Sequence, residues 1–139
     1  MRGTVKHRKL IALTVFLAII VFFACATPEE RAREAIVAGE TALASGNRDQ
    51  AIQHFAEATK LAPELADGWT QLAETQLAGE HWSKAIESAE KAAQLEPSSA
   101  DHHETIGKAA VELEDWNRAR DAYNKAFDLD GERSKLTYE

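Results

Sequence analysis

A repeat of 34 residues is the feature of this sequence that most constrains its fold. Shifting the chain against itself by that length superimposes residues in three copies: Ala51, Ala85 and Ala119; Ala58, Ala92 and Ala126; Leu61, Leu95 and Leu129; Gly39, Ala73 and Gly107; Pro63, Pro97 and Gly131. Self-similarity at such a period is typical of arrays in which each unit packs on its neighbours. We therefore expect three stacked structural units.

Each unit contains two segments of helical periodicity joined by a polar turn. The turns are predicted at residues 45–49, 79–83 and 113–117, with sequences SGNRD, GEHWS and LEDWN. The second helix of each unit is expected to end before Pro63, before Pro97 and at Gly131, which are helix-stop signals. Helix spacing is set by the residues at the contact. We therefore expect the small residues of the first helices to face those of the second, namely Gly39, Ala73 and Gly107 against Ala51, Ala85 and Ala119.

These units resemble the tetratricopeptide repeat, whose pattern is W-x2-L-G-x2-Y, then A-x3-F, then P. The matching residues are Trp69, Leu72, Ala73, Ala85 and Pro97 in the middle unit; Ala38, Gly39, Ala51, Phe55 and Pro63 in the first; and Ile106, Gly107, Ala119 and Tyr123 in the third. The departures are Ala35 and His103 for Trp, Gln76 for Tyr, and Ala89 for Phe. The resemblance implies an all-α helix-turn-helix repeat solenoid over residues 26–133, with repeats at about 32–65, 66–99 and 100–133 and a short tail at 134–139.

The resemblance also implies a binding groove, because in this family the first helices line a concave surface that meets the partner. Carried over, the groove positions are Arg33, Ile36, Glu40, Asp67, Thr70, Gln71, Glu74, Asp101, Glu104 and Lys108, with Leu43, Leu77 and Val111 as an apolar floor. Some family members hold a peptide's terminal carboxylate with Lys and Asn here, and this chain has mainly acidic residues instead. We expect a basic or apolar protein or peptide ligand. An acidic groove without a specific target is the alternative.

Residues 1–25 have the layout of a signal peptide or membrane anchor. Four basic residues within 2–9 precede the apolar run at 10–24. Ala24-Cys25 in "FFAC" resembles the bacterial lipoprotein signal, which implies lipid attachment at Cys25. Two alternatives stay open: ordinary cleavage at Ala24-Cys25-Ala26 with soluble release, and residues 10–26 as an uncleaved transmembrane helix. The basic head stays on the cytoplasmic side, so the repeats are expected on the exported, periplasmic or extracytoplasmic side of the cell envelope.

Charge and motifs exclude several classes of function. Residues 1–24 carry four of the sixteen basic residues and no acidic ones, so the remainder has twelve basic and twenty-three acidic residues, a formal net charge of −11. Such a chain lacks the basic stripe that a nucleic-acid-binding protein needs. There is no phosphate-binding glycine loop, G-x-S-x-G or H-E-x-x-H. We expect no enzyme activity and no cofactor.

The aromatic and histidine residues favour structural roles over ligand binding. Trp82 and Trp116 are one repeat apart and Trp69 is a motif position, so all three are expected to pack. His81, His102 and His103 are expected to be solvent-exposed or groove-lining; no metal site is predicted, because adjacent histidines on a helix point to different sides.

The last unit is expected to have an open end. After Gly131 only ERSKLTYE remains, whereas terminal repeats need a polar cap. Tyr123 and Phe127 would then form an end-face interaction site, used by a second copy or by the partner, unless Leu136 and Tyr138 fold back as a lid. The overall expectation is a membrane-tethered interaction scaffold that recruits envelope proteins, or alternatively a subunit of a membrane-embedded complex.

Overall fold

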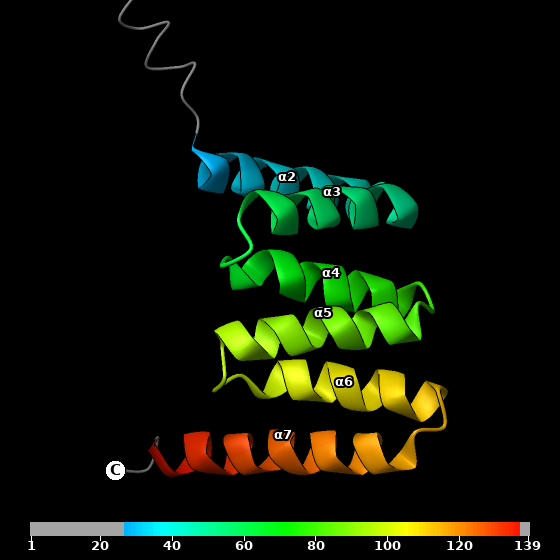
Figure 1. The fold of residues 1–139 in the computed structure, drawn as a ribbon, viewed down its shortest axis with the longest axis vertical. Helices are drawn as coiled ribbons and strands as arrows, with labels where there is room; N and C mark the ends of the chain where they lie inside the picture. The colour runs from blue at the N-terminus through cyan, green and yellow to red at the C-terminus, as the bar shows by residue number, and fades with distance from the viewer. Residues whose placement is uncertain (1–26, 137–139) are drawn as a thin grey trace, which may run out of the picture.

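The computed structural model describes residues 27–136, and it describes side chains for residues 27–131. Within this range the chain forms a stack of α-helices (Figure 1). The predicted signal or anchor segment, including Cys25, lies outside the described residues, as does Tyr138 of the predicted tail. Among the described residues, no helix combines the length and the apolar character that crossing a bilayer requires.

Six helices make up the described part of the chain, and it contains no strand. They are α2 (Pro28–Ala44), α3 (Arg48–Leu61), α4 (Ala66–Ala78), α5 (Trp82–Leu95), α6 (Ala100–Glu112) and α7 (Trp116–Leu136). The second helices begin at Arg48, Trp82 and Trp116, so the 34-residue period is also the period of the structure. The predicted all-α solenoid of three helix pairs is confirmed for these residues.

A capping box marks the start of the first helix. The backbone N–H of Glu30 donates to Thr27 Oγ1 at 3.1 Å, and the backbone N–H of Thr27 donates to Glu30 Oε2 at 2.7 Å. This capping box satisfies two N–H groups that the start of a helix leaves without partners. Pro28 occupies the first turn, where its missing N–H costs nothing.

A left-handed residue follows the end of each first helix at the same repeat position. Gly46, Glu80 and Glu114 have φ angles of 77°, 62° and 57°. Glycine adopts this conformation without strain, whereas an L-residue with a Cβ does so at a cost. The polar turns therefore reverse the chain in the same way three times, with one glycine and two glutamates.

The second helices end as predicted in two units and not in the third. α3 and α5 stop at Leu61 and Leu95, two residues before Pro63 and Pro97. α7 instead continues through Gly131 to Leu136, so the predicted end at Gly131 is wrong. A glycine lowers helix stability by only about 1 kcal/mol, whereas proline costs about 3 kcal/mol. Because Leu136 belongs to the same helix, it does not fold back over α7 as a lid.

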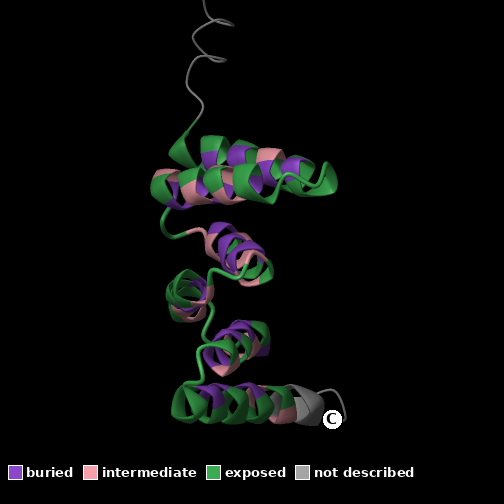
Figure 2. Ribbon diagram, turned by 90° about the vertical axis from the view of Figure 1, so that its right-hand side faces the viewer, coloured by how far each residue is buried: buried purple, intermediate pink, exposed green. Residues whose placement is uncertain are grey.

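The core consists of closely packed, mostly small side chains in two clusters. The first joins α2 and α3 with Leu72 of α4, and the second joins α5, α6 and α7 with Ala73 of α4. Phe55 is the largest side chain that is completely buried. Figure 2 shows the buried residues as stripes on the facing sides of the helices. The stack is therefore held together by contacts between successive helices.

The closest approach within a unit involves different residues from those predicted. The nearest side chain to a Cβ at Gly39 would be Phe55, and the nearest to a Cβ at Gly107 would be Tyr123. Ala51 and Ala119, the expected neighbours, are buried but are not the closest contacts. A glycine facing an aromatic ring sixteen residues later is thus the close contact in the first and third units.

A polar pair lies in the core of the middle unit. Ser88 Oγ donates to Gln76 Oε1 at 2.8 Å, and both residues are buried. Gln76 occupies the repeat position of Ala42 and Ala110, which are also buried. A buried polar group is tolerated when it is hydrogen-bonded, so Ser88 explains the glutamine that departs from the repeat pattern.

The tryptophans divide into two that pack and one that does not. Trp69 is half-buried against the first cluster, and its Nε1 donates to the carbonyl oxygen of Pro63 at 2.9 Å. Trp82 is half-buried against the second cluster. Trp116 is 63% exposed, so its predicted packing role is wrong, because the described residues include no later helix that could cover it.

Candidate partner-binding surface

The three first helices form one continuous side of the stack. α2 contacts α4 directly and α4 contacts α6, whereas α3, α5 and α7 do not contact one another among the described residues. In Figure 2, α4 and α6 lie on one side and α5 on the other. We call the solvent-facing side of α2, α4 and α6 the inner face. It is the surface on which the sequence places the binding groove.

Nine predicted groove residues lie on these helices with side chains that reach the surface. Arg33, Glu40, Asp67, Glu74, Asp101 and Lys108 are exposed, and Thr70, Gln71 and Glu104 are half-buried. Ile36 is different, because it is buried in the first core cluster; its predicted place in the groove is wrong. The floor residues Leu43, Leu77 and Val111 are partly exposed.

The basic groove residues are already paired with carboxylates of their own helices. Arg33 lies 2.9 Å from Glu29, and Lys108 lies 3.0 Å from Glu104. Four exposed carboxylates of the predicted groove form no ion pair with any described residue, namely Glu40, Asp67, Glu74 and Asp101. The inner face therefore presents unpaired negative charge beside a partly exposed apolar floor.

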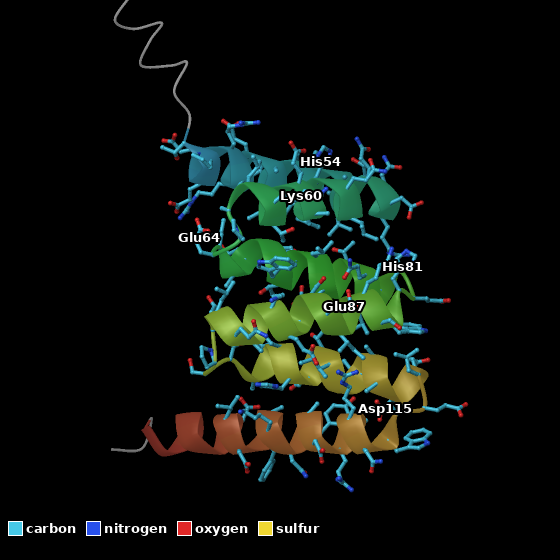
Figure 3. All side chains as sticks on the ribbon, viewed as in Figure 1. His54, Lys60, Glu64, His81, Glu87 and Asp115 are labelled. Carbon is cyan, nitrogen blue, oxygen red and sulfur yellow. The ribbon has the colours of Figure 1, made fainter. Side chains whose placement is uncertain are left out.

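A hollow that the sequence did not predict lies on the opposite side of the stack from the inner face. It has a volume of about 690 Å³ and lies between α5 and α7, with His103 and Ile106 of α6 in its wall. Arg118 crosses it and donates to Glu90 at 3.0 Å. Asp115, which directly precedes α7 and is labelled in Figure 3, also lines it. The 34-residue spacing could have indicated this hollow, because second helices that do not touch leave a gap over the intervening first helix.

The histidines have three different surroundings. His81 is exposed in the turn before α5 (Figure 3), which agrees with the expectation. His102 is buried, with Nε2 3.3 Å from Glu96 Oε2, so the expected exposure is wrong for this residue. Burial lowers the pKa of His103, and electrostatic interactions with Lys125 and His102 lower it further.

The described residues offer no centre for metal binding. No group of three or more His, Cys, Asp or Glu side chains among residues 27–131 is arranged to hold a metal ion. The ion pairs made by Arg and Lys side chains, such as Arg118 with Glu90, are exposed. Pairs of this kind contribute little stability.

The end of the stack exposes aromatic side chains, as the sequence predicts. Tyr123 is 39% exposed and Phe127 is 77% exposed. Trp116, on the same helix, adds to them. Figure 1 shows α7 at the end of the stack away from α2. The two ends of the described chain therefore lie far apart.

Comparisons with known proteins agree with this architecture. The family model described as Tetratricopeptide repeat matches residues 36–65. No curated protein matches the sequence. Many solved structures share the fold.

Three of the solved structures illustrate the likeness. The TPR domain of Arabidopsis OM64 is 20% identical, with a TM-score of 0.69 over 73% of this chain and 84% of that one. MamA is 22% identical, with a TM-score of 0.72 over 75% of this chain and 61% of that one. The second TPR domain of Spaghetti (RPAP3), bound to the HSP90 peptide SRMEEVD, is 18% identical, with a TM-score of 0.68 over 73% of this chain and 94% of that one.

The described residues thus form a helical-repeat solenoid without strands or a metal centre. The match at residues 36–65 and the structural likeness together support the tetratricopeptide repeat family.

Proposed function

We propose that this chain is a non-enzymatic scaffold whose inner face binds another protein. The observation that carries the proposal is the set of exposed carboxylates without ion pairs on α2, α4 and α6, beside a partly exposed apolar floor. Tetratricopeptide folds typically serve as interaction scaffolds, and RPAP3 binds a peptide. A surface of this chemistry suits a protein or peptide ligand.

The charge of the inner face selects the ligand. The peptide bound by RPAP3, SRMEEVD, contains three acidic residues and one arginine. Unpaired carboxylates at Glu40, Asp67, Glu74 and Asp101 would repel such a peptide, because like charges across an interface oppose binding. The ligand proposed here is a basic or apolar segment. Lysine or arginine side chains would pair with these carboxylates, and apolar side chains would cover Leu43, Leu77 and Val111.

The proposed location is the exported face of a bacterial membrane, in the cell envelope. The support comes from residues 1–25, where a basic head and an apolar run end at Cys25. α2 begins at Pro28, three residues after Cys25, so a lipid on that cysteine would hold the repeats directly against the bilayer. A scaffold held this way would recruit or assemble other envelope proteins.

An alternative proposal makes the chain a subunit of a membrane-embedded complex. The apolar run at residues 10–24 carries no charged residue, and a span needs about 20 predominantly apolar residues. Residues 10–26 would then remain as an uncleaved transmembrane helix packed on other spans. The two proposals predict different masses for the membrane-bound protein.

The C-terminal end of the stack is proposed as a second interaction surface. Tyr123 and Phe127 form its exposed part. An apolar patch on an otherwise polar protein often marks an interaction site. The inner face and this end face lie on different helices, so one chain has room for two ligands.

An affinity pull-down from native membranes tests the function. The full chain in mild detergent is the bait, compared with the inner-face variant Asp67→Lys/Glu74→Lys and the matched outer variant Glu57→Lys/Glu87→Lys. Glu57 and Glu87 are exposed on α3 and α5, and Figure 3 labels Glu87. We expect the unsubstituted bait to capture an envelope protein. The amount captured should fall at least about tenfold for the inner-face variant only, and it should decrease with added salt. Equal capture by both variants would contradict the proposal.

A further inference from the structure

An uninterrupted row of side chains runs along the exposed side of α7. Its members are Trp116, Arg120, Tyr123, Phe127 and Asp130, spaced alternately four and three residues apart. Residues with this spacing share one face of a helix. All five are exposed, and Phe127 is the most exposed large apolar side chain among the described residues. We call this row the α7 stripe.

In the first unit, the fold covers the same face with a helix. Two repeat periods before Tyr123 and Phe127 stand Phe55 and Thr59, which are 0% and 6% exposed. The covering helix there is α4: a Cβ added at Gly68 would lie 3.5 Å from Cγ2 of Thr59. α4 follows α3 after a four-residue link, so it runs back along α3 in the antiparallel direction. The described residues supply no such helix for α7.

The α7 stripe is complementary to itself when two copies meet antiparallel. Arg120 lies three residues before Tyr123, and Asp130 lies three residues after Phe127. A two-fold axis beside residue 125 therefore places Tyr123 of one copy opposite Phe127 of the other, twice. The same register places Arg120 opposite Asp130, twice. Aromatic contacts at the centre and ion pairs on both sides result from one arrangement.

We propose that two copies of this chain associate through their α7 stripes as a symmetric antiparallel pair. Each α7 then covers the stripe of the other, which no helix of the described residues covers. The inference rests on the proposed use of the C-terminal face and commits it to one occupant. Two-fold dimers are the commonest symmetric assemblies.

The size of the stripe suits a small specific interface. An aromatic side chain can bury about 150–250 Å². Scaled by their exposed fractions, the six aromatic side chains of the pair contribute about 540–900 Å². Arg120 and Asp130 add further area, so the total approaches the roughly 1,000 Å² that marks a specific protein–protein interface. Arg120 now contacts Asp121 at 2.9 Å in an exposed pair. Such a pair exchanges partners at little cost.

A head-to-tail stack of copies fits the surfaces less well. The opposite end of the solenoid is α2, where Val37 is exposed and Glu34, three residues before it, lies on the same side. That face has no aromatic residue and would place a carboxylate against the apolar stripe. The symmetric pair buries aromatic against aromatic and charge against opposite charge.

Thiol crosslinking of the full chain in its native membrane tests this arrangement. Asn124 is exposed on α7, and in the symmetric pair its two copies lie about 3 Å apart along the helix axes. Asn124→Cys treated with a short bis-maleimide should give a crosslinked dimer. Gln53→Cys, at an exposed position on α3, should remain monomeric. The unsubstituted chain, treated in the same way, is the control for any crosslinking through Cys25.

Charge exchange separates the specific pair from general stickiness. Adding Arg120→Asp to Asn124→Cys should lower the crosslinked fraction at least about fivefold, and adding Asp130→Arg as well should restore it. Phe127→Glu should abolish crosslinking while leaving the helical dichroism and ligand capture by the inner face unchanged. That last readout distinguishes failure of this inference from failure of the proposed function.

Three outcomes would overturn the proposal. The first is a monomeric Asn124→Cys chain whose dichroism spectrum is unchanged. The second is a dimer that the Arg120→Asp substitution does not weaken. The third is a crosslink between Asn124→Cys and Val37→Cys, which would assign the end face to head-to-tail stacking.

Discussion

Gly39 of α2 and Phe55 of α3 are in such close contact that a Cβ on the glycine would lie 2.5 Å from the Phe55 ring. The third unit repeats this relationship with Gly107 and Tyr123, where the distance is 2.9 Å. The middle unit has Ala73 and Ala89 at the same two positions, and both are buried. In the first and third units a glycine on the first helix therefore faces a large aromatic residue on the second, whereas in the middle unit two alanines occupy these positions. Because a smaller residue on one helix accompanies a larger one on the other, the two helices of each unit keep their spacing.

This balance predicts coupled effects on stability. Gly39→Ala in residues 26–139 should destabilise the fold by about 1–3 kcal/mol, because it overpacks a rigid contact. Phe55→Ala should cost about 3–5 kcal/mol through the cavity it leaves. The double variant recreates the middle unit's pair and should be more stable than the sum of the single effects predicts. Urea unfolding followed by circular dichroism measures all three; additive effects would contradict the coupling.

The left-handed turn residues predict a stabilising change. Glu80 and Glu114 have φ angles of 62° and 57° at the position that Gly46 occupies in the first unit. Glu80→Gly and Glu114→Gly should each raise the free energy of unfolding by about 0.5–1 kcal/mol, because glycine relieves the strain of a Cβ at positive φ. Glu57→Gly, inside α3, is the control and should destabilise by about 1 kcal/mol. A lower free energy of unfolding for both Glu80→Gly and Glu114→Gly would contradict this prediction and show that the glutamate side chains stabilise the turns.

The lowered pKa of His103 predicts how the stability of the fold changes with pH. Burial, Lys125 and His102 hold the pKa of His103 below its usual 6.5. The folded chain therefore binds a proton there less readily than the unfolded chain, so this residue's contribution favours folding above pH 6.5 and is lost as the pH falls below that value. Nuclear magnetic resonance titration of the ring should give a value below 6.5, and Lys125→Gln should raise it. Lys84→Gln, a distant lysine on α5, serves as the control. A ring that titrates at 6.5 or above would contradict the prediction.

Much of this fold could be predicted from the sequence, because its determinants are local and repeated. The polar turns, the capping box at Thr27 and the stops before Pro63 and Pro97 depend on residues close together in the chain. The end of α7 could not be predicted from Gly131, because a single glycine weakens a helix without ending it. The groove positions came from the resemblance to the tetratricopeptide repeat; nine of them reach the surface of α2, α4 and α6, whereas Ile36 is buried.

Side-chain contacts between helices were the less predictable part. The pairing of Gly39 with Phe55 depends on how two helices are rotated against each other, which the repeat period leaves undetermined. His102 is buried, with its ring nitrogen beside Glu96 just after α5, a contact between two helical units that the repeat period does not reveal. The Gln76–Ser88 hydrogen bond left a signal in the sequence, since a polar residue stands at a repeat position that is otherwise alanine.

Processing at Cys25 predicts the mass of the mature protein. If Cys25 carries the proposed lipid, intact mass spectrometry of membrane fractions should find a chain that lacks residues 1–24 and has a lipid-sized addition. Cys25→Ala should block this processing or release the repeats from the membrane. Retention of Met1 in the membrane-bound chain would contradict the lipid proposal and favour residues 10–26 as a transmembrane helix.

Site-specific photocrosslinking tests the central claim, that the inner face binds a protein partner, most directly. A photoreactive residue at Glu74 of α4 is compared with one at Glu57 of α3 in the full chain, irradiated in its native membrane. We expect a discrete protein adduct from position 74 that Asp67→Lys/Asp101→Lys removes, and none from position 57. An adduct from position 57 alone, or one from position 74 that survives the charge reversal, would contradict the account.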